Sequence, residues 1–298
     1  MRLLGALIVG WVIAATCGIA QAADCTNPDA LGVSRSLAVD PSVDRLIGTI
    51  QYRNSLALED HEVVLTFDDG PLPRYSNAIL DILASECVTA TYFMVGEMAQ
   101  NFPSMVRKIA AAGHTIGTHS QTHPFAFERL PIERARRQIE NGISSVTAAL
   151  GDSGEVAPFF RIPGLGRQNA VEKYLMERKL SVFSADVVGD DWRRIRAKEV
   201  VKRTMRRLEA KGRGIILLHD IHAVTVMALP VLLRELKSHG YRVVHLTPLP
   251  VEPLPPNQVP LPPERPKPGD PESMPVAFGN PFVIAIADTP MTFMGEAE

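Results

Sequence analysis

The sequence predicts an α/β protein in which about seven parallel strands form a closed or nearly closed barrel. Apolar residues make up 46% and charged residues 21% of the 298-residue chain, which is typical of a globular protein. Short apolar runs rich in β-branched and aromatic residues alternate with amphipathic helical segments. The runs are continuously apolar, which indicates strands covered on both faces of a parallel sheet. Barrels of this kind commonly use 200 to 250 residues, so one catalytic domain is expected.

The N-terminus has the form of an export signal. Arg2 is followed by the apolar run "LLGALIVGWVIAATCGIA" and then by "AQA" ending at Ala22, a small-x-small cleavage pattern. We predict a signal peptide over 1–22 and a periplasmic or secreted protein, with an uncleaved anchor as the alternative. Two cysteines remain after cleavage, Cys25 and Cys87, which either pair in an oxidising compartment or stay free thiols.

Residues 23–59 are predicted to form an N-terminal arm and residues 60–247 the barrel. Beyond the barrel, residues 248–275 hold 12 of the 24 prolines. Proline lacks a backbone N–H, so this part of the tail, 248–298, favours an extended conformation. A later apolar segment, 280–290, is either a strand that docks back or an interaction segment.

Each element of the barrel is predicted from its own pattern. Apolar runs with β-branched and aromatic residues predict strands at 62–67, 89–95, 114–118, 159–161, 180–185, 214–218 and 241–246. Amphipathic periodicity between these runs predicts helices at 75–86, 103–112, 131–150, 168–179, 197–211 and 225–239.

Five predicted strands end on a residue capable of acid, base or metal chemistry. These residues are Asp68 with Asp69, His119, Arg161, Asp186 and His219. The carboxyl ends of parallel barrel strands converge on one mouth, so we expect these side chains to meet in space. An acidic pair by itself has a simpler explanation, since Asp is a favoured cap and turn residue.

The pair His119 and His123 favours a metal site. A spacing of four places both imidazoles on one side of a helical turn, which suits two-point binding of one ion. Two histidines with one carboxylate leave coordination positions open, as in catalytic sites for Zn²⁺, with Fe²⁺ or Co²⁺ at similar ligands. The sequence therefore predicts one divalent metal ion, zinc first, with cobalt, iron or nickel as alternatives.

A metal at this position gives the neighbouring residues roles in hydrolysis of an amide or ester. One Asp of the pair binds the ion and the other acts as general base. Arg161 is expected to hold the base ionised by a charge-assisted hydrogen bond. His219, oriented by Asp186 or Asp191, is expected to be the general acid.

Five ordered motifs resemble a known family. "TFDDGP", "HSQTHP", "FFRIPG", "ADVVGDDW" and "ILLHD" are similar to those of the NodB-like polysaccharide deacetylases, carbohydrate esterase family four, over about residues 60–246. The resemblance implies a distorted (β/α) barrel that removes acetyl groups from N- or O-acetylated sugars. It implies that Asp68 is the base, that Asp69, His119 and His123 hold the metal, that Arg161 tethers the base and that His219 is the acid. It further implies substrate-binding roles for Pro163, Trp192 and Leu217.

The chain departs from the family pattern at two positions. The stretch "RIPGLG" has no aromatic residue, whereas the third motif usually has one near the position of Gly164. Asp186 and Asp191 are separated by four residues rather than two. These departures leave the sugar preference and the orienting acid open. His222 either lines the mouth or is an ordinary histidine of the surface or core.

Two other functions are alternatives, namely hydrolysis of a small C–N substrate by the same metal site and non-catalytic glycan binding. The charge balance of 31 basic to 33 acidic residues provides no global field that would recruit nucleic acid or an anionic membrane. The expected partner is an acetylated glycan, and no membrane span is expected after signal cleavage. The sequence predicts no oligomeric state.

Overall fold

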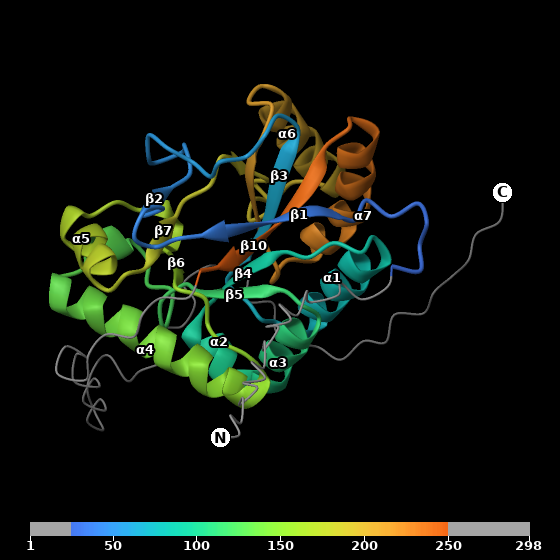
Figure 1. Cartoon of the computed structure of the whole chain (residues 1–298). Helices are drawn as coiled ribbons and strands as arrows, with labels where there is room; N and C mark the ends of the chain where they lie inside the picture. The colour runs from blue at the N-terminus through green and yellow to red at the C-terminus, as the bar shows by residue number, and fades with distance from the viewer. Residues whose placement is uncertain (1–24, 250–298) are drawn as a thin grey trace, which may run out of the picture.

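The computed structural model describes residues 25–249, which form a parallel sheet surrounded by helices (Figure 1). The sheet order is β1-β10-β3-β4-β5-β6-β7-β2, with β9 also beside β3 and β8 beside β9. The strands are β1 (Val33–Val39), β2 (Leu46–Ile47), β3 (Glu62–Asp68), β4 (Thr91–Met94), β5 (Thr115–Thr118), β6 (Phe159–Arg161), β7 (Ser181–Phe183), β8 (Val187–Val188), β9 (Gly214–His219) and β10 (Arg242–Pro248).

One stretch of chain connects the two edges of the barrel. β7 pairs with β6, and after a three-residue gap the same stretch forms β8 and pairs with β9. β9 in turn pairs with β3 along its whole length. The predicted α/β fold with parallel strands is confirmed, and all seven predicted strands are present within a few residues of their expected bounds.

The helices also follow the prediction, with one addition. The α-helices are α1 (Pro73–Ser85), α2 (Gly96–Asn101), α3 (Pro103–Ala111), α4 (Ile132–Leu150), α5 (Asn169–Glu177), α6 (Ala197–Glu209) and α7 (Ala223–Ser238). Only α2 was not predicted, because six residues are too few for a periodic apolar pattern. Short 3₁₀ turns lie at Phe127–Arg129, Gly151–Ser153 and Pro163–Leu165.

The barrel strands are buried on both faces. Along β3, Val63, Leu65 and Phe67 pack with the surrounding helices, whereas Val64 packs with Phe93 and other residues of a second cluster. Every residue of β3 is buried, which accounts for its continuous apolar run. Burial of each large apolar side chain contributes about 1.5–3 kcal/mol. This packing fixes the positions of the residues at the strand ends.

The segment predicted to be an N-terminal arm belongs to the same sheet. β1 pairs with β10, and β2 pairs with β7 (Figure 1). β1 alternates between more and less exposed residues, as expected of a strand with one covered face, and its pairing satisfies the outer edge of β10. β10 continues to Pro248, one residue beyond the expected end of the barrel at 247.

A disulfide between Cys25 and Cys87 joins the start of the described chain to the loop after α1. Within residues 25–249, no helix combines the length and apolar character needed to cross a bilayer. The predicted signal peptide, 1–22, lies outside the described residues, and so does the proline-rich tail from residue 250 on.

Candidate active site

The predicted site residues converge at the carboxyl ends of β3, β5, β6 and β9. Asp68 is the last residue of β3 and lies in register with His219, the last residue of β9. Asp69 follows with a positive φ of 75°, so the chain turns sharply after the strand. The sheet therefore brings together side chains that are up to 151 positions apart in the sequence (219 minus 68).

Asp69, His119 and His123 form a group that fits a metal ion. Asp69 Oδ1 lies 3.4 Å from Nε2 of each histidine, and one potential ligand atom from each residue lies within 4.8 Å of the others. His119 Nδ1 is 2.7 Å from the carbonyl oxygen of Arg161, so Nδ1–H donates and Nε2 presents its lone pair. Asp69 Oδ1 is buried and has no hydrogen-bond partner among the described residues. A divalent cation would satisfy this oxygen and both imidazoles at once.

The two histidines do not lie on a helical turn, as their spacing had suggested. Residues 119–126 form an irregular loop in which Ser120 and His123 have positive φ angles of 68° and 49°. The Ser120 hydroxyl accepts a hydrogen bond from the His123 amide at 3.1 Å, which stabilises this turn. The local backbone, rather than helical periodicity, brings the two rings to a centroid distance of 4.9 Å.

Arg161 holds Asp68 in place by a fully buried ion pair. Its Nη1 donates to Asp68 Oδ1 at 2.6 Å and to Thr66 Oγ1 at 2.8 Å, and Nη2 donates to the Ser184 carbonyl at 2.8 Å. The guanidinium also lies 4.1 Å from the Phe93 ring centroid. Burial lowers the pKa of Arg161, while the Asp68 carboxylate opposes that shift. Asp68 Oδ2 is directed to the metal group, 3.8 Å from His119 Nε2.

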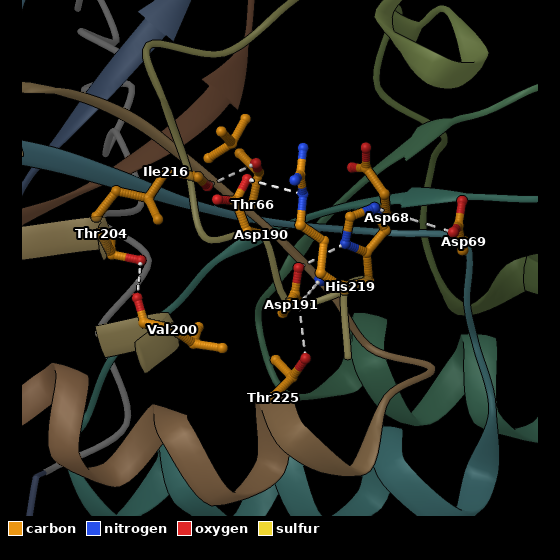
Figure 2. A network of polar contacts seen from close by, with 12 residues as sticks. Thr66, Asp68, Asp69, Asp190, Asp191, Val200, Thr204, Ile216, His219 and Thr225 are labelled. Atoms are coloured by element: carbon orange, nitrogen blue, oxygen red, sulfur yellow. Dashed lines mark hydrogen bonds and ion pairs between the residues drawn. The ribbon is translucent and has the colours of Figure 1, made fainter. Parts of the chain in front are cut away.

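His219 is oriented by Asp191. Its Nδ1 is 2.8 Å from Asp191 Oδ1, its amide donates to Asp191 Oδ2 at 2.8 Å, and Thr225 Oγ1 donates to the same oxygen at 2.6 Å (Figure 2). Burial alone would lower the pKa of His219, but the Asp191 carboxylate, together with Asp69 and Asp68, outweighs it and raises the pKa to about 10. His219 Nε2 then carries its proton toward the metal group, 4.0 Å from Asp69 Oδ2.

Asp186, the other candidate for orienting His219, does not contact it. Its carboxylate accepts hydrogen bonds from the Thr49 amide, the Thr49 and Ser55 hydroxyls and the Ile215 amide. Ile215 precedes His219 by four residues on β9, about 13 Å along the strand at 3.3 Å per residue. Asp186 therefore lies at the other end of the barrel, because the chain reaches the mouth only after β8.

Two predicted substrate-binding residues, Trp192 and Leu217, lie near His219, whereas Pro163 follows β6. The Trp192 ring is 42% exposed and meets the His219 ring edge-on at a centroid distance of 5.5 Å. The His222 ring lies 5.7 Å from His219. Leu217 is two residues before His219 on β9 and so shares its face of the sheet. Pro163 is buried in the turn after β6.

Sequence reasoning missed two supporting residues. Thr225 on α7 anchors Asp191, and no local pattern indicates that contact. Asp220 is buried beneath the turn at Gly70, where a Cβ would lie 2.1 Å from its carboxylate oxygen, and accepts a hydrogen bond from Ser76 Oγ at 2.5 Å. Burial raises the pKa of Asp220 to about 7. Its position directly after His219 is the only sequence signal.

Known proteins resemble this chain over the same region. A family model described as "Polysaccharide deacetylase" matches residues 56–182. A peptidoglycan-N-acetylglucosamine deacetylase of Bacillus cereus is 32% identical over 63% of this chain and 87% of its own length. A deacetylase of the same name from Listeria monocytogenes is 31% identical over 63% of this chain, but the match spans only 38% of that relative.

A solved structure is also similar to this chain. The peptidoglycan deacetylase of Bdellovibrio bacteriovorus matches with a TM-score of 0.65 and 31% identity, covering 74% of this chain and 61% of that one. The stretch matched by the family model, 56–182, contains Asp68 and all three residues of the metal group.

Proposed function

The chain belongs to the polysaccharide deacetylase family, and on that premise we propose that it hydrolyses acetyl groups from N- or O-acetylated carbohydrate. One observation carries the proposal. The three-residue metal group has a tethered carboxylate, Asp68, 3.8 Å from one ligand, and an imidazole, His219, 4.0 Å from another. A base and an acid beside one metal are the groups that metal-assisted hydrolysis requires.

Asp69, His119 and His123 are the proposed metal ligands. A divalent ion held there would act as a Lewis acid that polarises the acetyl carbonyl and makes water more acidic. Zinc suits two imidazoles and a carboxylate, and cobalt, iron and nickel are alternatives with similar ligand preferences. The loop with Ser120 and His123 in left-handed conformation keeps both rings beside Asp69.

Asp68 is the proposed general base. It takes a proton from water as the water oxygen bonds to the acetyl carbon. Arg161 binds Asp68 Oδ1, which leaves Oδ2 directed to the metal group as the oxygen that receives the proton. Thr66, Ser184 and Phe93 fix the guanidinium, so the base is preorganised before substrate arrives.

His219 is the proposed general acid. Its Nε2 donates a proton to the leaving sugar nitrogen or oxygen as the bond to the acetyl carbon breaks. Asp191 holds Nδ1–H, so Nε2 is the nitrogen available to the substrate. Trp192 beside His219 offers an exposed aromatic face against which a sugar ring can pack.

The proposed substrate class is a cell-wall or related acetylated glycan, by analogy with the relatives named for peptidoglycan. We also propose that the protein is exported and acts in the periplasm or outside the cell. The disulfide between Cys25 and Cys87 supports an oxidising compartment. The barrel with β1 and β2 is proposed to be the whole catalytic domain.

Metal content tests the ligand set independently of activity. Purified wild type should hold about one divalent ion per chain, and His119→Ala and His123→Ala should lose most of it, because each removes one of three protein ligands. His61→Ala is the matched control, since His61 is a surface histidine paired with Asp60. Equal metal content in all four proteins would refute the site.

Acetate release tests the reaction and the substrate. Metal-loaded protein is incubated with peptidoglycan, chitin oligomers, acetylated xylan and a small acetylated amide. Release from at least one glycan, lost in His119→Ala and kept in His61→Ala, is the expected result. Release from the small amide alone would favour the C–N hydrolase alternative, and no release with metal bound would favour a binding protein.

A further inference from the structure

A cavity of about 550 Å³ lies at the end of the barrel opposite the metal group. Gly214, the first residue of β9, lines it, whereas His219 is the last residue of that strand. Five steps of about 3.3 Å place the two ends about 17 Å apart. The N-terminal segment, from Thr49 to Leu58, forms one wall, and the turn between α6 and β9 forms another.

Asp186, the acidic residue of this cavity, already accepts as many hydrogen bonds as its carboxylate can. Asp186 is 5% exposed, and each of its oxygens accepts two hydrogen bonds. The donors are Thr49 and Ser55 on the N-terminal segment and the Ile215 amide on β9. Asp186 therefore joins that segment to the barrel and shapes the cavity floor, with no lone pair left for another cation.

Three basic side chains line the same cavity. Lys211 Nζ donates to Thr49 Oγ1 at 2.6 Å, and Arg213 Nη1 donates to the Leu58 carbonyl at 2.8 Å. Arg53 has no hydrogen bond or ion pair with any residue in 25–249, and neither Lys211 nor Arg213 is in an ion pair with an acidic side chain of that range. Most N–H groups of these three side chains therefore have no hydrogen-bond acceptor within residues 25–249.

Arg53, Lys211 and Arg213 are exposed to solvent, which screens their mutual repulsion, and the Asp186 carboxylate in the same lining offsets one of the three charges. The lining keeps a net positive charge, which favours an anion bound between the three side chains. Leu56 and Leu58, both buried, lower the polarity of the wall, which strengthens such an interaction. The volume lies within the range of small-ligand pockets. A doubly charged tetrahedral oxyanion can accept hydrogen bonds from two guanidinium groups and one ammonium group at the same time.

We propose that this cavity is a second binding site, distinct from the metal group, that takes a phosphate-type oxyanion through Arg53, Lys211 and Arg213. The anion is either free phosphate or the phosphate monoester of a larger molecule. The site is independent of acetyl hydrolysis, because the two ligands occupy opposite ends of the barrel.

Calorimetric titration of the metal-loaded protein with inorganic phosphate and with glycerol 3-phosphate tests the proposal. Wild type should bind at least one of them, and tighter binding of the ester would identify an esterified ligand. Arg53→Gln should weaken binding about tenfold, and Arg53→Gln with Lys211→Gln about a hundredfold, because each removes a charge-assisted contact. The Arg53 side chain makes no hydrogen bond or ion pair within residues 25–249, so its replacement breaks none there.

Arg234→Gln, an exposed arginine on α7 away from the cavity, is the control and should bind as wild type. All variants should release acetate at the wild-type rate. Binding equally strong in wild type and in the double variant would place the anion elsewhere, including at the metal, and would overturn the proposal. Absence of binding to both probes in wild type would overturn it as well.

Discussion

Replacing Asp191 by Asn should change the pH dependence of catalysis. Asn keeps the size of the side chain but removes the charge that raises the pKa of His219 to about 10. In the absence of that charge, burial lowers the pKa and only Asp69 and Asp68 still raise it, so the pKa of His219 should fall well below 10. The rise from the ordinary pKa of 6.5 to about 10, to which Asp69 and Asp68 also contribute, corresponds to about 5 kcal/mol of differential stabilisation of the protonated imidazole.

The loss of activity should depend on pH. At pH 8, a pKa of about 10 leaves His219 about 99% protonated, whereas a pKa of about 6.5 leaves it about 3% protonated. The variant should therefore lose up to about thirtyfold of kcat at pH 8 and much less at pH 5.5, because only the protonated form donates. The assay is acetate release from an acetylated glycan between pH 5 and 10, at equal metal content.

Thr225→Val is the matched control. It removes one hydrogen bond to Asp191 Oδ2 but leaves the carboxylate charge beside His219. The pH at which its kcat falls on the alkaline side should stay within about one pH unit of the wild-type value. If Asp191→Asn lowers kcat by the same factor at every pH, or leaves the alkaline limb in place, Asp191 does not act through the protonation of His219.

Three further predictions concern other parts of the chain. Asp68→Asn should lower kcat by about 10² to 10⁴ while elemental analysis finds the metal retained, and loss of the metal would show that Asp68 is a ligand instead. Burial, aided by His245, lowers the pKa of His114 to about 4, so the stability due to its neutral form is present above pH 6.5 and lost as the pH falls toward 4. In urea unfolding, wild type should lose about 2 kcal/mol more than His114→Gln between pH 7 and 4.5, and parallel losses would contradict this. Truncation after Leu249, whose amide bonds to Val39, should leave the melting temperature and turnover nearly unchanged, and a large drop in either would make the tail part of the fold.

The barrel strands and the residues at their ends follow from the sequence alone. A buried parallel strand must be continuously apolar, so its run in the sequence stops where the chain reaches the mouth. Asp68 and His219 are therefore predicted to share one mouth from the sequence pattern, because parallel strands present their carboxyl ends on the same side. The motif resemblance predicts the same residues.

Tertiary structure decided the contacts between segments that carry no local signal. Asp186 and Asp191 stand in one short motif, "ADVVGDDW", and only the path of the chain through β7 and β8 decides which one reaches His219. The pairing of β1 with β10 joins residues about 200 positions apart, and its alternating pattern fits any half-covered strand. Such contacts depend on the order and register of the whole sheet. Backbone hydrogen bonds between strands form whatever the side chains are, so they leave no pattern in the sequence.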